Sequence, residues 1–191
     1  MARARRKQPE GLLLAPGAGT DCHHSSLLAI EAAVAPMPVR RFDFPYRRAG
    51  RRAPDRAPVL LQSVRDEIDA ACEEWGVGSV VVGGRSMGGR MCSMVAAEGH
   101  PAIAGVVAIC YPLHPPGKPE KLRVEHLVDL RVPCLFVSGD RDPFGTPDEL
   151  TAATATIPGK VTHHWLPGKR HDLKGADAEI ADVVAAWIRS L

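Results

Sequence analysis

Six short strand-like runs recur along the chain. They cover residues 12–15, 39–44, 79–83, 105–111, 134–139 and 161–166. Most of these runs are continuously apolar and do not alternate with polar residues, which is typical of strands covered on both faces of a parallel sheet. The pattern therefore predicts a mostly parallel six-stranded sheet.

Helical periodicity fills the intervals between these runs. Apolar residues recur at helical spacing over 60–75 and over 180–191, and we also expect helices near 25–35, 87–98 and 147–156. Strands that alternate with helices predict an α/β fold with helices on both faces of the sheet.

Two segments interrupt this alternation. Residues 45–58 are rich in arginine and punctuated by proline, which predicts a loop. Residues 112–132 begin with three prolines and contain a short helical stretch near 120–130, which predicts a minimal cap. We expect residues 11–191 to form a single domain, and residues 1–10 to form a basic tail.

Charge and cysteine content narrow the class of protein. The net charge of +2 gives no reason to expect nucleic acid binding. The five cysteines are an odd number without CxxC spacing, which predicts free thiols in a reducing compartment. No apolar run approaches the length of a membrane span. We therefore expect a cytoplasmic protein without membrane contact.

The segment from Gly84 to Gly88 carries the strongest chemical signal. It reads Gly-Arg-Ser-Met-Gly, between an apolar run and an expected helix, and so matches the GxSxG pattern in a strand–turn–helix context. In that context the serine lies on a strained turn with its hydroxyl exposed, and the glycines avoid collisions with neighbouring backbone. Ser86 is therefore the candidate nucleophile.

A serine nucleophile needs a base and an orienting acid. After the fifth apolar run, Asp140 and Asp142 both offer a carboxylate, although Asp140 is also suited to stabilising its own turn. After the sixth run, His171 is the candidate base. His163 and His164 compete for that role, but they lie within a strand, where successive side chains point to opposite faces. Ser86, an aspartate and His171 would thus meet at the carboxyl ends of the strands.

The loop after the first apolar run offers an oxyanion hole. The backbone N–H of Ala18, or alternatively that of Gly17, would be one donor, and the N–H of Met87 would be the other. Gly17 would then lie at the substrate. Arg85, inside the elbow, is either an exposed side chain or a ligand for a substrate carboxylate. The sequence has no metal-binding motif and predicts no cofactor.

Several stretches together resemble the α/β-hydrolase superfamily. They are LLLAPGAGT, VVVGGRSMGGR, CYPLHPPGKPEKLR, PCLFVSGDRDPFG and the His171 loop, and the likeness extends over residues 11–191. It is closest to the dienelactone-hydrolase-like proteins and the testis-expressed hydrolase-like group within them. The resemblance implies that the acid is the aspartate of a Gly-x-x-Asp pattern, here Asp142, and that the loop 17–19 flanks Ser86.

Two functions follow as hypotheses. In the first, Ser86, His171 and Asp142 hydrolyse a small-molecule ester through an acyl-enzyme. In the second, the protein is a non-catalytic or weakly catalytic interaction module that uses the arginines of the loop 40–56, since some members of the closer group resemble scaffolds in larger complexes. A homodimer or another protein partner is compatible with either hypothesis.

Overall fold

The computed structural model describes residues 8–191, and the basic residues expected in the N-terminal tail before position 8 lie outside this range. Within it, six strands form one sheet: β1 (Gly11–Ala15), β2 (Val39–Arg41), β3 (Val80–Arg85), β4 (Ile103–Ile109), β5 (Cys134–Gly139) and β6 (Val161–Leu166). Their order is β2-β1-β3-β4-β5-β6, and all neighbours pair in parallel. The α/β architecture with a six-stranded sheet is confirmed.

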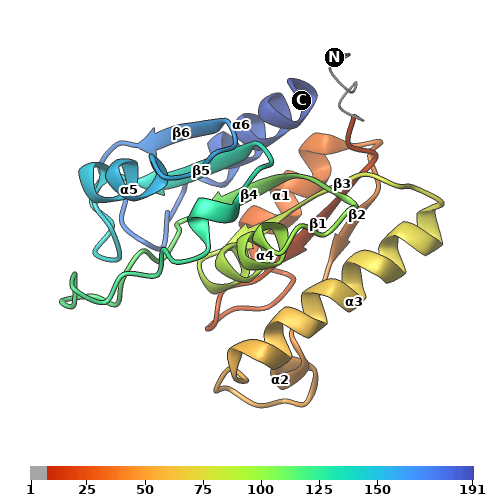
Figure 1. Cartoon of the computed structure of the whole chain (residues 1–191), viewed down its shortest axis with the longest axis horizontal. Coiled ribbons are helices and arrows are strands. Elements are labelled where there is room, and N and C mark those ends of the chain that lie inside the picture. Colours follow the sequence, from red (N-terminus) through yellow and green to blue (C-terminus); the bar gives the residue numbers. More distant parts are fainter. Residues whose placement is uncertain (1–7) are drawn as a thin grey trace.

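Helices cover both faces of this sheet (Figure 1). Helices α1 (Ser25–Val34) and α6 (Asp177–Arg189) pack together on one face. Helices α3 (Ala57–Trp75) and α4 (Met87–Ala97) cover the other face, together with α5 (Pro147–Thr154). Among residues 8–191, no helix combines the length and the apolar character that crossing a membrane would require.

The two faces bury separate apolar layers because alternate side chains of each strand point to opposite sides. Leu13, Val80 and Val82 belong to the layer beneath α3 and α4. Leu12, Leu14 and Val81 belong to the layer beneath α1 and α6. This explains the continuously apolar runs, since neither face of such a strand contacts solvent and polar side chains are disfavoured on both.

The segment after β2 differs from the expectation. The strand ends at Arg41, and the expected loop begins with a short helix, α2 (Pro45–Arg48). Phe42, Phe44 and Tyr46 leave the sheet and bury their rings in the α3 layer, with Phe42 and Phe44 in edge-to-face contact at 5.6 Å between centroids. Pro45 begins the helix because its fixed φ suits the first helical position.

The cap segment also differs from the expectation. In place of the short helix expected near 120–130, the structure has a single 3₁₀ turn, Leu127–Asp129. Leu127 and Leu130 are buried, whereas the preceding residues 116–122 are largely exposed. The turn thus attaches the cap to the core through few apolar side chains. Because helices in proteins are stabilised mainly by packing of an apolar face, this small buried surface does not support a longer helix.

The strand order determines where a site can form. Strand β1 pairs with β2 on one side and with β3 on the other, so the chain leaves β1 and β3 in opposite directions across the sheet. Such a switch point opens a crevice at the carboxyl ends of the strands. The loop after β1 and the turn after β3 therefore meet at one edge.

Candidate active site

Ser86 occupies a strained turn between β3 and α4. Its backbone adopts φ 46° and ψ −114°, a conformation that non-glycine residues rarely take. Gly84 has φ 153°, and a Cβ there would overlap the carbonyl oxygen of Ala15. At Gly88 a Cβ would lie 2.5 Å from the carbonyl oxygens of both Ala15 and Pro16. The two glycines thus let the turn press against the end of β1.

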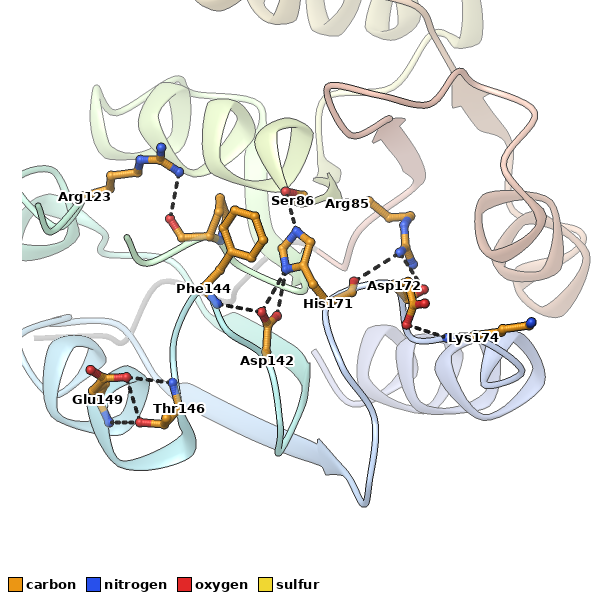
Figure 2. A network of polar contacts seen from close by, with 11 residues as sticks. Arg85, Ser86, Arg123, Asp142, Phe144, Thr146, Glu149, His171, Asp172 and Lys174 are labelled. Atoms are coloured by element: carbon orange, nitrogen blue, oxygen red, sulfur yellow. Dashed lines mark hydrogen bonds and ion pairs between the residues drawn. The ribbon is translucent and has the colours of Figure 1, made fainter. Parts of the chain in front are cut away.

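The three candidate catalytic side chains form one hydrogen-bonded chain (Figure 2). The Ser86 Oγ lies 2.9 Å from Nε2 of His171. Nδ1 of the same ring lies 2.8 Å from Oδ2 and 3.0 Å from Oδ1 of Asp142. Because a carboxylate only accepts, Nδ1 carries the proton and Nε2 is left to accept the hydroxyl proton of Ser86. The arrangement can activate the hydroxyl for nucleophilic attack.

The two candidate acids have different environments. Asp142 is only 2% exposed, and it faces His171. Asp140 is exposed and accepts a hydrogen bond of 2.7 Å from the N–H of Gly168, so it joins its loop to the loop after β6, and this contact is not within its own turn. The geometry therefore favours Asp142 as the partner of His171.

The two rival histidines have other contacts. Nε2 of His163 pairs with Oγ1 of Thr154, and its ring stacks on Trp165. Nε2 of His164 contacts Glu179 at 2.9 Å. Both belong to β6, and their contacts keep them apart from the chain of hydrogen bonds at Ser86.

Phe144 supports both members of the acid–base pair. Its backbone N–H donates to Oδ1 of Asp142 at 2.9 Å, which fixes the carboxylate. Its ring stacks on the His171 imidazole with 3.9 Å between centroids and an interplanar angle of 27°. One residue thus restricts the rotation of the acid and of the base.

The loop after β1 lies beside Ser86, as the predicted oxyanion hole requires. A Cβ built on Gly17 would lie 3.7 Å from the Cβ of Ser86. The Gly17 N–H is already bonded to Oγ1 of Thr20 at 3.0 Å, which argues against Gly17 as the donor. Within residues 8–191, the N–H groups of Ala18 and Met87 form no hydrogen bond with another group, so both are available to a ligand.

Tyr46 anchors this loop from α2. Its hydroxyl donates to the carbonyl oxygen of Ala18 at 2.9 Å, and its side chain is fully buried. Because the N–H of Ala18 belongs to the same residue, this contact limits the orientations that the proposed donor can adopt. Tyr46 is therefore a positioning residue for the loop.

Arg85 differs from the exposed elbow side chain that the sequence allowed. It is 5% exposed, and its Nη2 donates to the carbonyl oxygen of Asp172 at 2.9 Å, with a longer contact of 3.5 Å to that of His171. Nη1 lies 3.4 Å from Oγ of Ser26. Figure 2 shows this guanidinium reaching the loop that carries His171. Binding of a substrate carboxylate stays a prediction, while these contacts tie the elbow to the base.

A pocket of about 740 Å³ opens over Ser86. Its wall includes Ala18, Met87 and His171, together with two arginines, Arg90 from α4 and Arg123 from the cap. The volume lies within the range of small-molecule sites, which is about 300–1,000 Å³.

Cys110 also lines this pocket. Burial raises the pKa of its thiol to about 11. The thiol is therefore protonated near neutral pH and is a poor nucleophile compared with a thiolate. Cys110 therefore does not compete with Ser86 for the role of nucleophile.

The arginine-rich stretch 40–56 is largely neutralised by carboxylates of the same chain. Arg41 binds Glu31 at 2.6 Å, Arg48 binds Glu67 at 2.7 Å, and Arg51 binds Asp55 at 2.7 Å. Ion pairs also join Arg40 to Glu67 and Glu74, and Arg47 to Asp21. This pairing argues against the use of the stretch as a free cationic surface.

Sequence reasoning overlooked four residues that the fold brings to the site: Tyr46, Phe144, Arg90 and Arg123. Tyr46 had a weak signal, because an aromatic residue in an otherwise polar segment suggests burial. Phe144 and the two arginines had none, since their contacts depend on how separate loops pack.

Known proteins share this architecture. The sequence profile of an alpha/beta hydrolase domain family matches residues 8–187. Est1E from Butyrivibrio proteoclasticus is 14% identical, with a TM-score of 0.76 over 98% of this chain and 90% of its own. A dienelactone hydrolase from Anabaena variabilis is 16% identical, with a TM-score of 0.76 over 96% and 88%. A monoacylglycerol lipase from Paleococcus ferrophilus is 16% identical, with a TM-score of 0.73 over 96% of both chains. These structures share the fold of this chain.

Proposed function

The chain belongs to the alpha/beta hydrolase family, and on that premise we propose that it is a serine hydrolase that cleaves small acyl esters. The observation that carries the proposal is the hydrogen-bonded chain from Ser86 through His171 to the buried Asp142, with contacts of 2.9 and 2.8 Å. A pure scaffold has no physical need for these three side chains in this order.

The proposed reaction has two halves. In the first, Oγ of Ser86 attacks the ester carbonyl carbon while Nε2 of His171 takes the hydroxyl proton, and Asp142 stabilises the imidazolium. The C–O bond to the alcohol then breaks, and His171 returns the proton to that oxygen. In the second half, His171 removes a proton from water, which attacks the carbonyl carbon of the acyl-enzyme. The bond from that carbon to Ser86 Oγ then breaks, and His171 returns the proton to Oγ as the acid leaves.

The N–H groups of Ala18 and Met87 would bind the negative oxygen of each tetrahedral intermediate. Met87 is the first residue of α4, so its N–H has no intrahelical partner and the helix dipole favours an anion there. Removal of one such donor typically costs about 100- to 1,000-fold in kcat.

The substrate class follows from the pocket and the relatives. The short cap leaves the approximately 740 Å³ pocket accessible, which suits a small acyl ester. Two structures of the same fold are a dienelactone hydrolase and a monoacylglycerol lipase, names that refer to ester cleavage. We expect an activity of this kind without a metal or a cofactor.

The cysteines support a cytoplasmic location. All five lie in the part of the chain that the structure describes, and all five are free thiols. Free thiols persist in reducing compartments.

Hydrolysis of 4-nitrophenyl acetate by wild type and by Ser86→Ala tests the proposal. We expect Ser86→Ala to lose at least about 1,000-fold in kcat, since the nucleophile is gone. Ser190→Ala, an exposed serine at the end of α6, is the matched control and should retain wild-type rates. Equal rates for wild type and Ser86→Ala would contradict the proposal and favour the non-catalytic interaction module.

A further inference from the structure

We propose that Arg90 and Arg123 form an anion-binding subsite in the Ser86 pocket, so that the substrate is an ester bearing a carboxylate or a phosphate. The inference deepens the proposed ester hydrolysis and rests on it. It assigns a substrate class that the triad alone does not give.

Arg90 brings a positive charge close to the nucleophile. It lies four residues after Ser86, and its N–H donates to the Ser86 carbonyl oxygen at 3.1 Å. The Arg90 side chain lines the pocket that opens over Ser86. The Arg90 Nε is buried without a hydrogen-bond partner among residues 8–191. A buried donor without a partner is costly, and a ligand would relieve that cost.

Arg123 supplies the second charge from the cap. Its Nη1 donates to the carbonyl oxygen of Pro112 at 3.3 Å (Figure 2), and its own N–H holds it to Leu113 at 2.9 Å. Burial, and then the nearby charge of Arg90, lower the pKa of Arg123. Both arginines line the pocket over Ser86, so an anion bound there would meet positive charge from α4 and from the cap.

Neither of these arginines has a carboxylate within 4.0 Å in the part of the chain that the structure describes. Three other charged side chains among residues 8–191 line the pocket, and the Asp172 carboxylate accepts from the N–H of Lys174 at 3.3 Å. The guanidinium of Arg85 donates to backbone carbonyl oxygens, and Asp55 is held by Arg51. Apart from Arg85, the other described arginines without a carboxylate partner are exposed, whereas Arg90 and Arg123 are half-buried at the pocket.

Matched ester pairs test the inference. Charged 4-nitrophenyl glutarate is compared with neutral 4-nitrophenyl pentanoate, which has the same acyl chain length, and uncatalysed hydrolysis is subtracted. We expect wild type to prefer the charged ester in kcat/KM by about 10-fold or more. Arg90→Met and Arg123→Met should each lower that preference by about 10- to 100-fold, the factor that a charged hydrogen bond contributes. The preference is a ratio of two esters measured on the same variant, so a loss of activity common to both esters leaves it unchanged.

The controls separate a charge effect from a folding defect. Arg189→Met removes an exposed arginine of α6 and should leave the preference unchanged. Arg90→Lys keeps the charge and should retain part of the preference. A wild-type enzyme that prefers the neutral ester, or a preference that survives in both Met variants, would overturn the subsite.

Equilibrium binding distinguishes failure of the subsite from failure of the proposed hydrolysis. Isothermal titration calorimetry of Ser86→Ala with glutarate, and separately with inorganic phosphate, needs no turnover. Binding of either anion that is lost when Arg90→Met is added supports the subsite even if no ester is cleaved, and the tighter of the two identifies the anion. Binding of neither anion would overturn it, even if Ser86 hydrolyses neutral esters.

Discussion

Replacement of Arg85 by methionine should slow catalysis through the loop that carries His171. The substitution removes the 2.9 Å hydrogen bond to the carbonyl oxygen of Asp172, while the contacts of 3.4 and 3.5 Å to Ser26 and His171 are long and contribute less. The acceptor that remains has no replacement donor on methionine. The base would then lose the contact that ties its loop to the nucleophile turn.

The magnitude follows from that single strong contact. A hydrogen bond to a charged group contributes about 1.5–3 kcal/mol, and each 1.36 kcal/mol corresponds to a factor of 10 in rate. If the whole free energy of this hydrogen bond is lost from the transition state, kcat falls by about 10- to 150-fold. This agrees with the roughly 100-fold loss of rate expected when a catalytic group is displaced by about 1 Å. The free energy of unfolding should fall by about 1–3 kcal/mol.

Steady-state hydrolysis of a neutral 4-nitrophenyl ester measures this effect, with urea denaturation run in parallel. We expect Arg85→Met to lower kcat while KM changes by less than about threefold, and Arg85→Lys to recover part of kcat. Ser26→Ala removes the 3.4 Å contact to Arg85 and a 3.1 Å contact to His24, but it leaves the bond to Asp172 intact; it is the control and should remain near wild type. A wild-type kcat in Arg85→Met would refute the positioning role. A raised KM that is confined to a charged ester would instead favour the predicted contact with a substrate carboxylate.

Three further predictions test the site and its surroundings. Asp142→Asn should lower kcat by about 10⁴-fold because His171 would lose the partner that sets its tautomer. Asp140→Asn should lower kcat by less than about threefold. Equal losses of kcat in esterase assays would contradict the assignment of Asp142 as the acid. Gly88→Ala should destabilise the protein by more than about 2 kcal/mol in urea denaturation, because the added Cβ would lie 2.5 Å from two carbonyl oxygens; unchanged stability would show that the turn can shift. Burial, and then the charge of Arg90, lower the pKa of His126 to about 4 in the folded protein. As the pH falls from about 6.5 to 4, the unfolded chain takes up a proton on His126 that the folded protein does not, so the free energy of unfolding decreases. Relative to His126→Gln, wild type should lose about 3 kcal/mol over that range in pH-dependent denaturation, and parallel curves would contradict the shift.

Much of the fold could be predicted because most of the strands are largely apolar. The runs at 134–139 and 161–166 match β5 and β6, since each is bounded by polar or turn residues. The end of β2 could not be predicted in this way. Phe42 and Phe44 extend the strand-like stretch that begins at Val39, but they pack beneath α3 after the strand has ended. The sequence does not distinguish a residue that pairs with the next strand from one that only packs on the core.

The site residues likewise fall into those that the sequence could predict and those that it could not. Ser86, Asp142 and His171 could be located because each lies in the turn or loop that follows a strand, and the strand order brings such positions together. The direction of a long side chain could not be predicted. Arg85 turns inward to the His171 loop, and Arg90 lines the pocket one turn later in the same motif. Their roles depend on the arrangement of separate loops, which local sequence does not encode.

The central claim is that Ser86 is an activated nucleophile. Labelling of the folded protein with a fluorophosphonate, followed by intact mass and peptide mapping, tests it most directly. We predict one adduct, on Ser86, that is absent in Ser86→Ala and forms much more slowly in His171→Ala. An intact mass that shows no adduct on folded wild-type protein, or an adduct mapped to another residue, would contradict the account.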